Sequence, residues 1–127
     1  MDQLIMFEFA ALAAGLQSKR YHVRELAVVH VRTEDSQPWR LFDPLQRDAD
    51  AAELAAAARV DVWHHVDYVV ALIRGTGTLR VVAHDYDGAP PNPLQFSTDV
   101  RLAAWRRAVT ECAAYFGRDV GKPWWRS

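Results

Sequence analysis

The sequence predicts an α+β fold: a single domain over residues 1–127, in which a small antiparallel sheet of three to four strands carries helices on one face. Three observations support this. The chain has 127 residues, and half of them are apolar, which suffices for one modest core. Apolar residues recur at helical spacing near both ends. Val-rich segments lie between them, so the expected element order is approximately α-β-β-α-β-α.

The first expected element is a helix from residue 2 to about residue 20. Several alanines favour a helix, and the apolar positions follow an i, i+4, i+7, i+11 spacing. These positions are Ile5, Phe9, Leu12 and Leu16. A buried strand over residues 4–9 is the alternative, because a short apolar run fits both structures.

The middle of the chain predicts a β-hairpin followed by a helix. Residues 25–32 are rich in β-branched side chains, and the polar residues 33–37 separate them from a second short strand at 39–42. Asp50 followed by Glu53 resembles a capping box, with Asp50 as the N-cap of an alanine-rich helix.

Residues 61–74 fit two structures, of which the helix is favoured. In a helix, their apolar positions fall within one arc of about 100°. The β-branched content and the following Gly-Thr-Gly turn favour a strand instead. In that alternative, a hairpin places Arg74 opposite Thr78, Tyr68 opposite His84 and Asp67 opposite Asp85.

The last third of the chain predicts a strand, a loop and a long helix. Residues 78–86 alternate and are rich in Val, whereas three prolines make residues 88–93 a loop. One apolar stripe predicts a helix over residues 98–116, with Gly117 as its C-terminal cap. The stripe comprises Leu102, Trp105, Val109, Cys112, Tyr115 and Phe116. Residues 122–127 form a tail that either docks on the core or stays exposed.

Composition excludes several classes of function. The net charge of -1 and the pI near 6.5 argue against general nucleic-acid binding and against attachment to an anionic membrane. A single cysteine excludes an internal disulfide and any site built from several thiolates. The apolar residues 4–16 are interrupted by Glu8 and are too short to span a bilayer, so we expect a cytoplasmic protein. The preference for Arg and Ala suggests a GC-rich, bacterial genome.

Histidines and carboxylates gather on both sides of the expected chain reversal. His64, His65 and Asp67 precede it, and His84, Asp85 and Asp87 follow it, so either structure of residues 61–74 brings the two groups together. A metal site needs three or four such ligands. The corresponding hypothesis is a metal-dependent or acid/base hydrolase with a divalent metal at His64, Asp67, His84 and Asp85.

The tryptophans indicate a binding surface. The chain contains five, and Trp39 and Trp105 have core positions on an expected strand and an expected helix. Trp63, Trp124 and Trp125 have no such positions. Exposed Trp, Tyr and Arg concentrate energy in protein interfaces, so these three residues are candidate anchors for a partner.

The leading hypothesis is a small, non-enzymatic protein-binding module of the inhibitor or immunity-protein type, without a cofactor. Its partner would be another protein, such as a basic enzyme or toxin. The expected binding surface combines Trp63, Trp124 and Trp125 with the acidic residues Asp61, Asp67, Asp85 and Asp87. The hydrolase is the first alternative. The second is a small-molecule pocket between sheet and helices, lined by Trp63, Tyr68, Tyr86 and Trp105.

Overall fold

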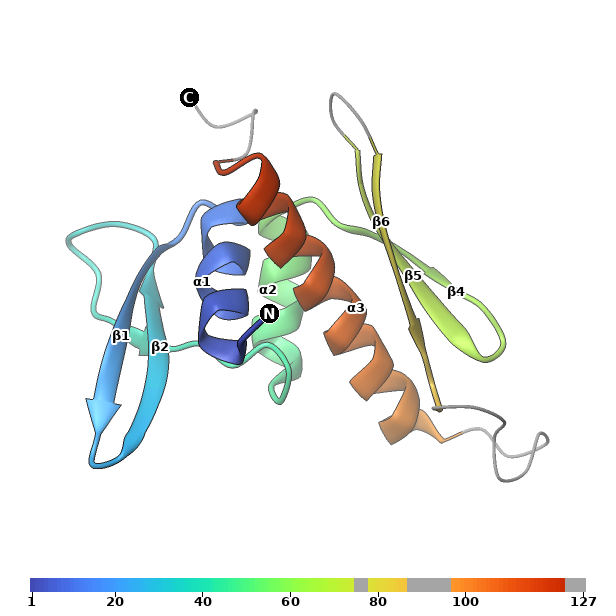
Figure 1. The fold of residues 1–127 in the computed structure, drawn as a ribbon, viewed down its shortest axis with the longest axis horizontal. Helices are drawn as coiled ribbons and strands as arrows, with labels where there is room; N and C mark the ends of the chain where they lie inside the picture. The colour runs from blue at the N-terminus through green and yellow to red at the C-terminus, as the bar shows by residue number, and fades with distance from the viewer. Residues whose placement is uncertain (75–77, 87–96, 123–127) are drawn as a thin grey trace.

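Three helices lie between two three-stranded antiparallel sheets in the computed structural model, which describes residues 1–74, 78–86 and 97–122 (Figure 1). The first sheet has the order β1-β2-β3 and packs on α1, and the second has the order β4-β5-β6 and packs on α3. The elements are α1 (Gln3–Ala13), β1 (Gln17–Val23), β2 (Leu26–Arg32), β3 (Arg40–Leu41), α2 (Asp48–Ala57), β4 (Asp61–His64), β5 (Tyr68–Arg74), β6 (Thr78–His84) and α3 (Thr98–Asp119).

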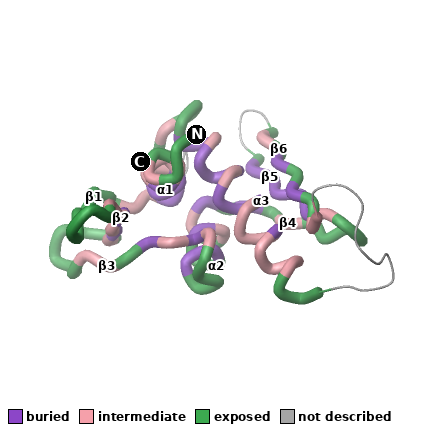
Figure 2. Tube along the Cα trace, turned by 60° about the horizontal axis from the view of Figure 1, so that its bottom comes forward, coloured by how far each residue is buried: buried purple, intermediate pink, exposed green. Residues whose placement is uncertain are grey.

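This architecture confirms the predicted α+β class. The sequence suggested one sheet, whereas the structure has two, because two segments expected to be helical are strands. The core lies in the helical layer and on the inward faces of both sheets (Figure 2). Within the described residues, no helix combines the length and the hydropathy that crossing a bilayer requires.

The first helix ends earlier than predicted. Asp2 caps its start by accepting a hydrogen bond from the backbone nitrogen of Leu4 at 2.7 Å. At its other end Gly15 has a φ of 73°, which turns the chain out of the helix. Residues 17–23 then form β1 as an exposed edge strand beside β2. The predicted continuation to residue 20 is therefore wrong.

The predicted hairpin between residues 25–32 and 39–42 is confirmed as β2 and β3, which pair with Val31 opposite Arg40. The predicted capping box is wrong. The second helix begins at Asp48, and Asp50 lies inside its first turn with a buried side chain. The Asp50 carboxylate accepts a hydrogen bond from the backbone nitrogen of Asp43 at 2.9 Å, so it fastens the preceding segment to the helix.

The favoured helix over residues 61–74 is also wrong, and the hairpin alternative is confirmed. Tyr68 lies opposite His84 and Arg74 opposite Thr78, as that alternative requires. The strand β5 is central in its sheet and apolar on both faces, so its run of apolar residues imitates a helical stripe.

The last helix extends through Gly117, which the sequence suggested as its cap. A Cβ atom at this position would lie 1.9 Å from the Phe9 carbonyl oxygen, so the missing side chain allows α1 and α3 to pack closely. The predicted stripe is buried at Val109, Cys112 and Phe116 and half-buried at its other positions. The predicted loop at 88–93 and the tail beyond residue 122 lie outside the described residues.

Candidate functional site

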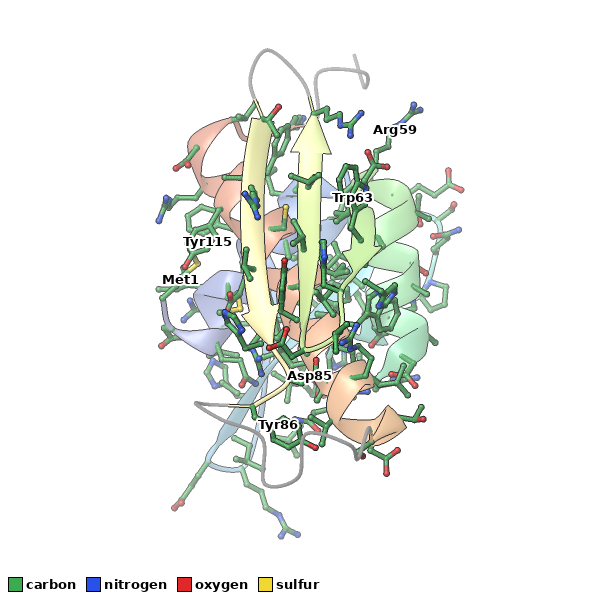
Figure 3. All side chains as sticks on the ribbon, turned by 90° about the vertical axis from the view of Figure 1, so that its right-hand side faces the viewer. Met1, Arg59, Trp63, Asp85, Tyr86 and Tyr115 are labelled. Carbon is green, nitrogen blue, oxygen red and sulfur yellow. The ribbon has the colours of Figure 1, made fainter. Side chains whose placement is uncertain are left out.

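The sheet β4-β5-β6 has one face against α3 and one face that no described element covers (Figure 3). Side chains alternate between the two faces along each strand. On β5, Val69, Ala71 and Ile73 belong to the core beside α3. Val70 and Leu72 therefore point the other way, toward the uncovered side.

Three cross-strand rows build this outer surface. Residues opposite one another in an antiparallel sheet share a face, so the strand register defines the rows. They are Asp61–Leu72–Arg80, Trp63–Val70–Val82 and His65–Tyr68–His84. We call the surface formed by Trp63, His65, Tyr68, Val70, Leu72, Arg80, Val82 and His84 the open face.

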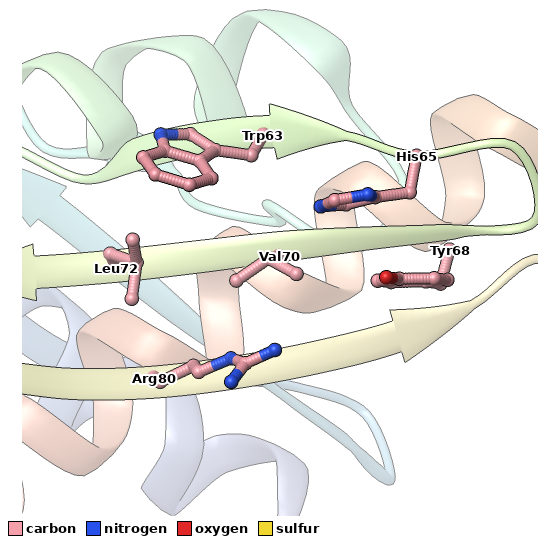
Figure 4. A pocket seen from close by; sticks show the side chains of 6 residues that line it. All are labelled: Trp63, His65, Tyr68, Val70, Leu72 and Arg80. Carbon is pink, nitrogen blue, oxygen red and sulfur yellow. The ribbon is translucent and has the colours of Figure 1, made fainter.

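The open face is apolar at its centre. Trp63 remains 53% exposed and Val82 40% exposed, although both are large hydrophobic side chains. A shallow groove of about 270 Å³ runs across the three strands. Figure 4 shows Trp63 and His65 on one side of it, Arg80 on the other, and Val70 and Leu72 between them.

Aromatic contacts fix the row nearest the β4–β5 turn. The His65 ring stacks on Tyr68 with a centroid distance of 4.4 Å and an interplanar angle of 10°. The His84 ring tilts against the other side of Tyr68 at 5.6 Å. The backbone nitrogen of His65 also donates to the Tyr68 carbonyl at 2.9 Å, which closes the turn beneath these rings.

Of the charged side chains at the edges of the open face, Asp61 has a partner and Arg80 has none among the described residues. Asp61 forms an ion pair with Arg74 at 3.6 Å. Arg80 is exposed, and neither an ion pair nor a hydrogen bond joins its side chain to any other residue in the described part of the chain. Arg80 is therefore available to a charge that approaches from outside.

Arg101 of α3 holds the turn and the end of β6 together. Its Nη2 atom donates to the carbonyl oxygens of His65 at 2.5 Å and Val66 at 2.9 Å. Its Nε atom lies 3.0 Å from Asp85 Oδ1, and its Nη1 atom lies 3.3 Å from His64 Nδ1. These contacts leave the Arg101 side chain only 21% exposed.

The residues of the metal hypothesis are near one another in the chain reversal but do not converge. His84 points to the open face, whereas His64 points to the opposite side, where it meets Arg101. Asp85 is engaged by the same arginine. Across residues 1–74, 78–86 and 97–122, no three His, Cys, Asp or Glu side chains come together as a metal site would require.

The residues of the binding hypothesis divide into several groups. Trp63 is exposed on the open face, and Asp61 and Asp67 are also exposed. The side chain of Asp85 is only 9% exposed and is paired with Arg101. Asp87, Trp124 and Trp125 lie outside the described residues.

The pocket suggested between sheet and helices does not assemble from the residues expected to line it. Trp63 and Tyr68 lie on the open face, while Trp105 is carried by α3 behind the sheet and packs against the core. The half-buried Tyr86 follows β6 and does not line the groove of the open face.

Comparison of the chain with protein-family models, with curated proteins and with solved structures finds no match in any of the three. A functional assignment therefore rests on the chemistry of the open face.

Proposed function

We propose that this chain is a non-enzymatic protein-binding module of the inhibitor or immunity-protein type, and that it binds its partner through the open face. The observation that carries the proposal is a sheet face that no described element covers, on which Trp63 of β4 and Val82 of β6 are 53% and 40% exposed on either side of the buried Val70. An antiparallel sheet with one solvated face normally alternates apolar and polar residues, so a Val, Leu and Trp centre on the outer side is unusual.

The composition of the open face supports a protein partner. Its centre is apolar, and histidines and Arg80 surround it, which is the arrangement of a protein interface with a hydrophobic core and a polar rim. Trp, Tyr and Arg are the residues most often found as binding hot spots. Trp63, Tyr68 and Arg80 supply one of each.

The open face is also preorganised. Arg101 fixes the β4–β5 turn through two backbone carbonyls, and Tyr68 is held between two histidine rings. A surface that is already ordered loses little conformational freedom on binding, so more of the contact energy contributes to affinity.

The acidic part of the hypothesis has less support than the aromatic part. The charge of Asp85 is matched by Arg101, and that of Asp61 by Arg74. Asp67 remains exposed at the turn. The proposal therefore keeps the protein partner without requiring that this partner be basic.

Trp63→Ala is the test, with Tyr21→Ala as its matched control. Both aromatic side chains are about half exposed, at 53% and 47%, but Tyr21 lies on the other sheet. Affinity for the protein captured from cells that make this chain should fall by about 2 kcal/mol or more with Trp63→Ala, roughly 30-fold, and stay near wild type with Tyr21→Ala. Equal affinities for the two variants would refute the proposal, provided that both unfold in urea like the wild type.

A further inference from the structure

We infer that the partner contacts the open face with a large apolar side chain that lies next to a carboxylate. The apolar side chain fills the groove beside Trp63, and the carboxylate pairs with Arg80. This inference rests on the proposed function and specifies the chemistry of the partner.

The dimensions of the groove favour one anchoring side chain over a free small molecule. Its volume of about 270 Å³ lies below the range of about 300–1,000 Å³ that is usual for small-molecule pockets. The groove is also open along its outer side (Figure 4). A small ligand there would keep much of its surface in water, whereas a side chain that belongs to a protein is covered by the rest of the interface.

The lining of the groove selects a bulky apolar group. Its floor consists of Val70 and Leu72, and the Trp63 indole and the Tyr68 ring stand beside them. Aromatic rings bury a large area and pack well edge-to-face or offset on other rings. A Phe, Tyr, Trp, Leu or Met side chain therefore suits this site better than a small or polar one.

The charge next to the groove selects a carboxylate. Arg80 lies opposite Leu72 in the register, so its guanidinium stands directly beside the apolar floor. Asp61 occupies the far end of the same row, and there it pairs with Arg74. Arg80 thus lacks an acidic partner among the described residues, and a partner that covers the groove removes water from its guanidinium. A carboxylate compensates that loss through two parallel hydrogen bonds, whereas a cation at this point is repelled.

The experiment is a selection of phage-displayed random peptides on the folded protein and on its Arg80→Glu variant. The wild type should enrich sequences with one large apolar residue and an Asp or Glu within a few positions of it. The variant should enrich Lys or Arg in place of the acidic residue, with the apolar residue kept. Lys19→Glu, which reverses an exposed cation on the other sheet, is the control and should enrich the same peptides as the wild type.

Calorimetry on synthetic peptides then isolates each contact. For the best wild-type peptide, changing its Asp or Glu to the amide should weaken binding about tenfold, as expected for a charge-assisted pair of about 1.4 kcal/mol. With Arg80→Gln protein, the acidic and amide peptides should bind equally. With Trp63→Ala protein, both should bind more weakly.

The outcomes separate this inference from the proposed function. Any of three results would overturn the inference about Arg80. The selected peptides could lack an acidic residue, the wild type and Arg80→Glu could select the same consensus, or no peptide could be enriched. The proposed function would remain standing in each case if Trp63→Ala still weakens binding of the captured protein. If Trp63→Ala leaves that binding unchanged, both are overturned.

Discussion

Replacing Arg101 with methionine should lower the free energy of unfolding by about 3 kcal/mol. Methionine keeps most of the apolar stem and removes the charge. The Asp85 side chain is 9% exposed, and its Oδ2 atom accepts hydrogen bonds from Arg101 Nε at 3.3 Å and Arg101 Nη2 at 3.1 Å, so the carboxylate depends on the Arg101 guanidinium. Breaking a buried ion pair at one partner costs about 3–5 kcal/mol. Because the Arg101 side chain is 21% exposed, water compensates part of that loss, and the expected range is about 2–4 kcal/mol.

Two further proteins, Asp85→Asn and the double variant Arg101→Met/Asp85→Asn, separate the effect of the ion-pair charge from the effect of Arg101 packing. Asp85→Asn should cost less than Arg101→Met, because Arg101 still donates to the turn carbonyls and reaches solvent. The double variant should be more stable than the sum of the two losses predicts, by about 1–3 kcal/mol. Urea unfolding followed by far-ultraviolet circular dichroism measures all four proteins. A loss below about 0.5 kcal/mol for Arg101→Met would refute the role of this side chain, because that is the effect of an ordinary surface substitution.

Three further predictions concern the core. Gly117→Ala should lower the thermal midpoint despite the better helix propensity of alanine, because its Cβ would lie 1.9 Å from the Phe9 carbonyl oxygen. The expected loss in the free energy of unfolding is about 1–3 kcal/mol, and an unchanged or higher midpoint would contradict this packing. Leu54→Ala should lower the free energy of unfolding in urea by about 2–5 kcal/mol, because the side chain is fully buried, and a loss under about 1 kcal/mol would contradict that placement. Burial raises the pKa of the Cys112 thiol to about 12, so at pH 8 a thiol reagent should label it only after unfolding; rapid labelling of the native protein would show it to be accessible.

The elements that the sequence predicts well are those whose apolar residues recur with a clear period. The strand β6 alternates between buried and exposed residues, and three residues of the predicted stripe on α3, Val109, Cys112 and Phe116, are buried. The strand β5 lacks such a signal, because its central position makes both faces apolar. The sequence does not predict the strand β1, for the opposite reason. All of its residues are exposed, so no apolar alternation marks it.

Prediction of the candidate site from the sequence was also only partly successful. The prediction that the polar ends of residues 61–74 and 78–86 meet needed only the chain reversal, and the backbone nitrogen of Asp85 does donate to the Asp67 carbonyl at 2.9 Å. The roles of Arg80 and Arg101 depend on which strands pair and on which charges those strands bring near. The hairpin alternative gave the pairing of β5 with β6, but sequence spacing carries no information about the charges that the fold brings near Arg80 and Arg101, so the roles of these two arginines emerge only from the structure.

The most direct test of the open face as the binding surface is photo-crosslinking from a single position in cells that make this protein. A photoreactive amino acid at Val82, which is 40% exposed in the central row of the open face, should crosslink to one partner protein. The same amino acid at Leu26, which is 72% exposed on the other sheet, should give no such product although it is more accessible. A partner captured from position 26 and absent at position 82 would place the binding surface elsewhere and contradict the proposed function.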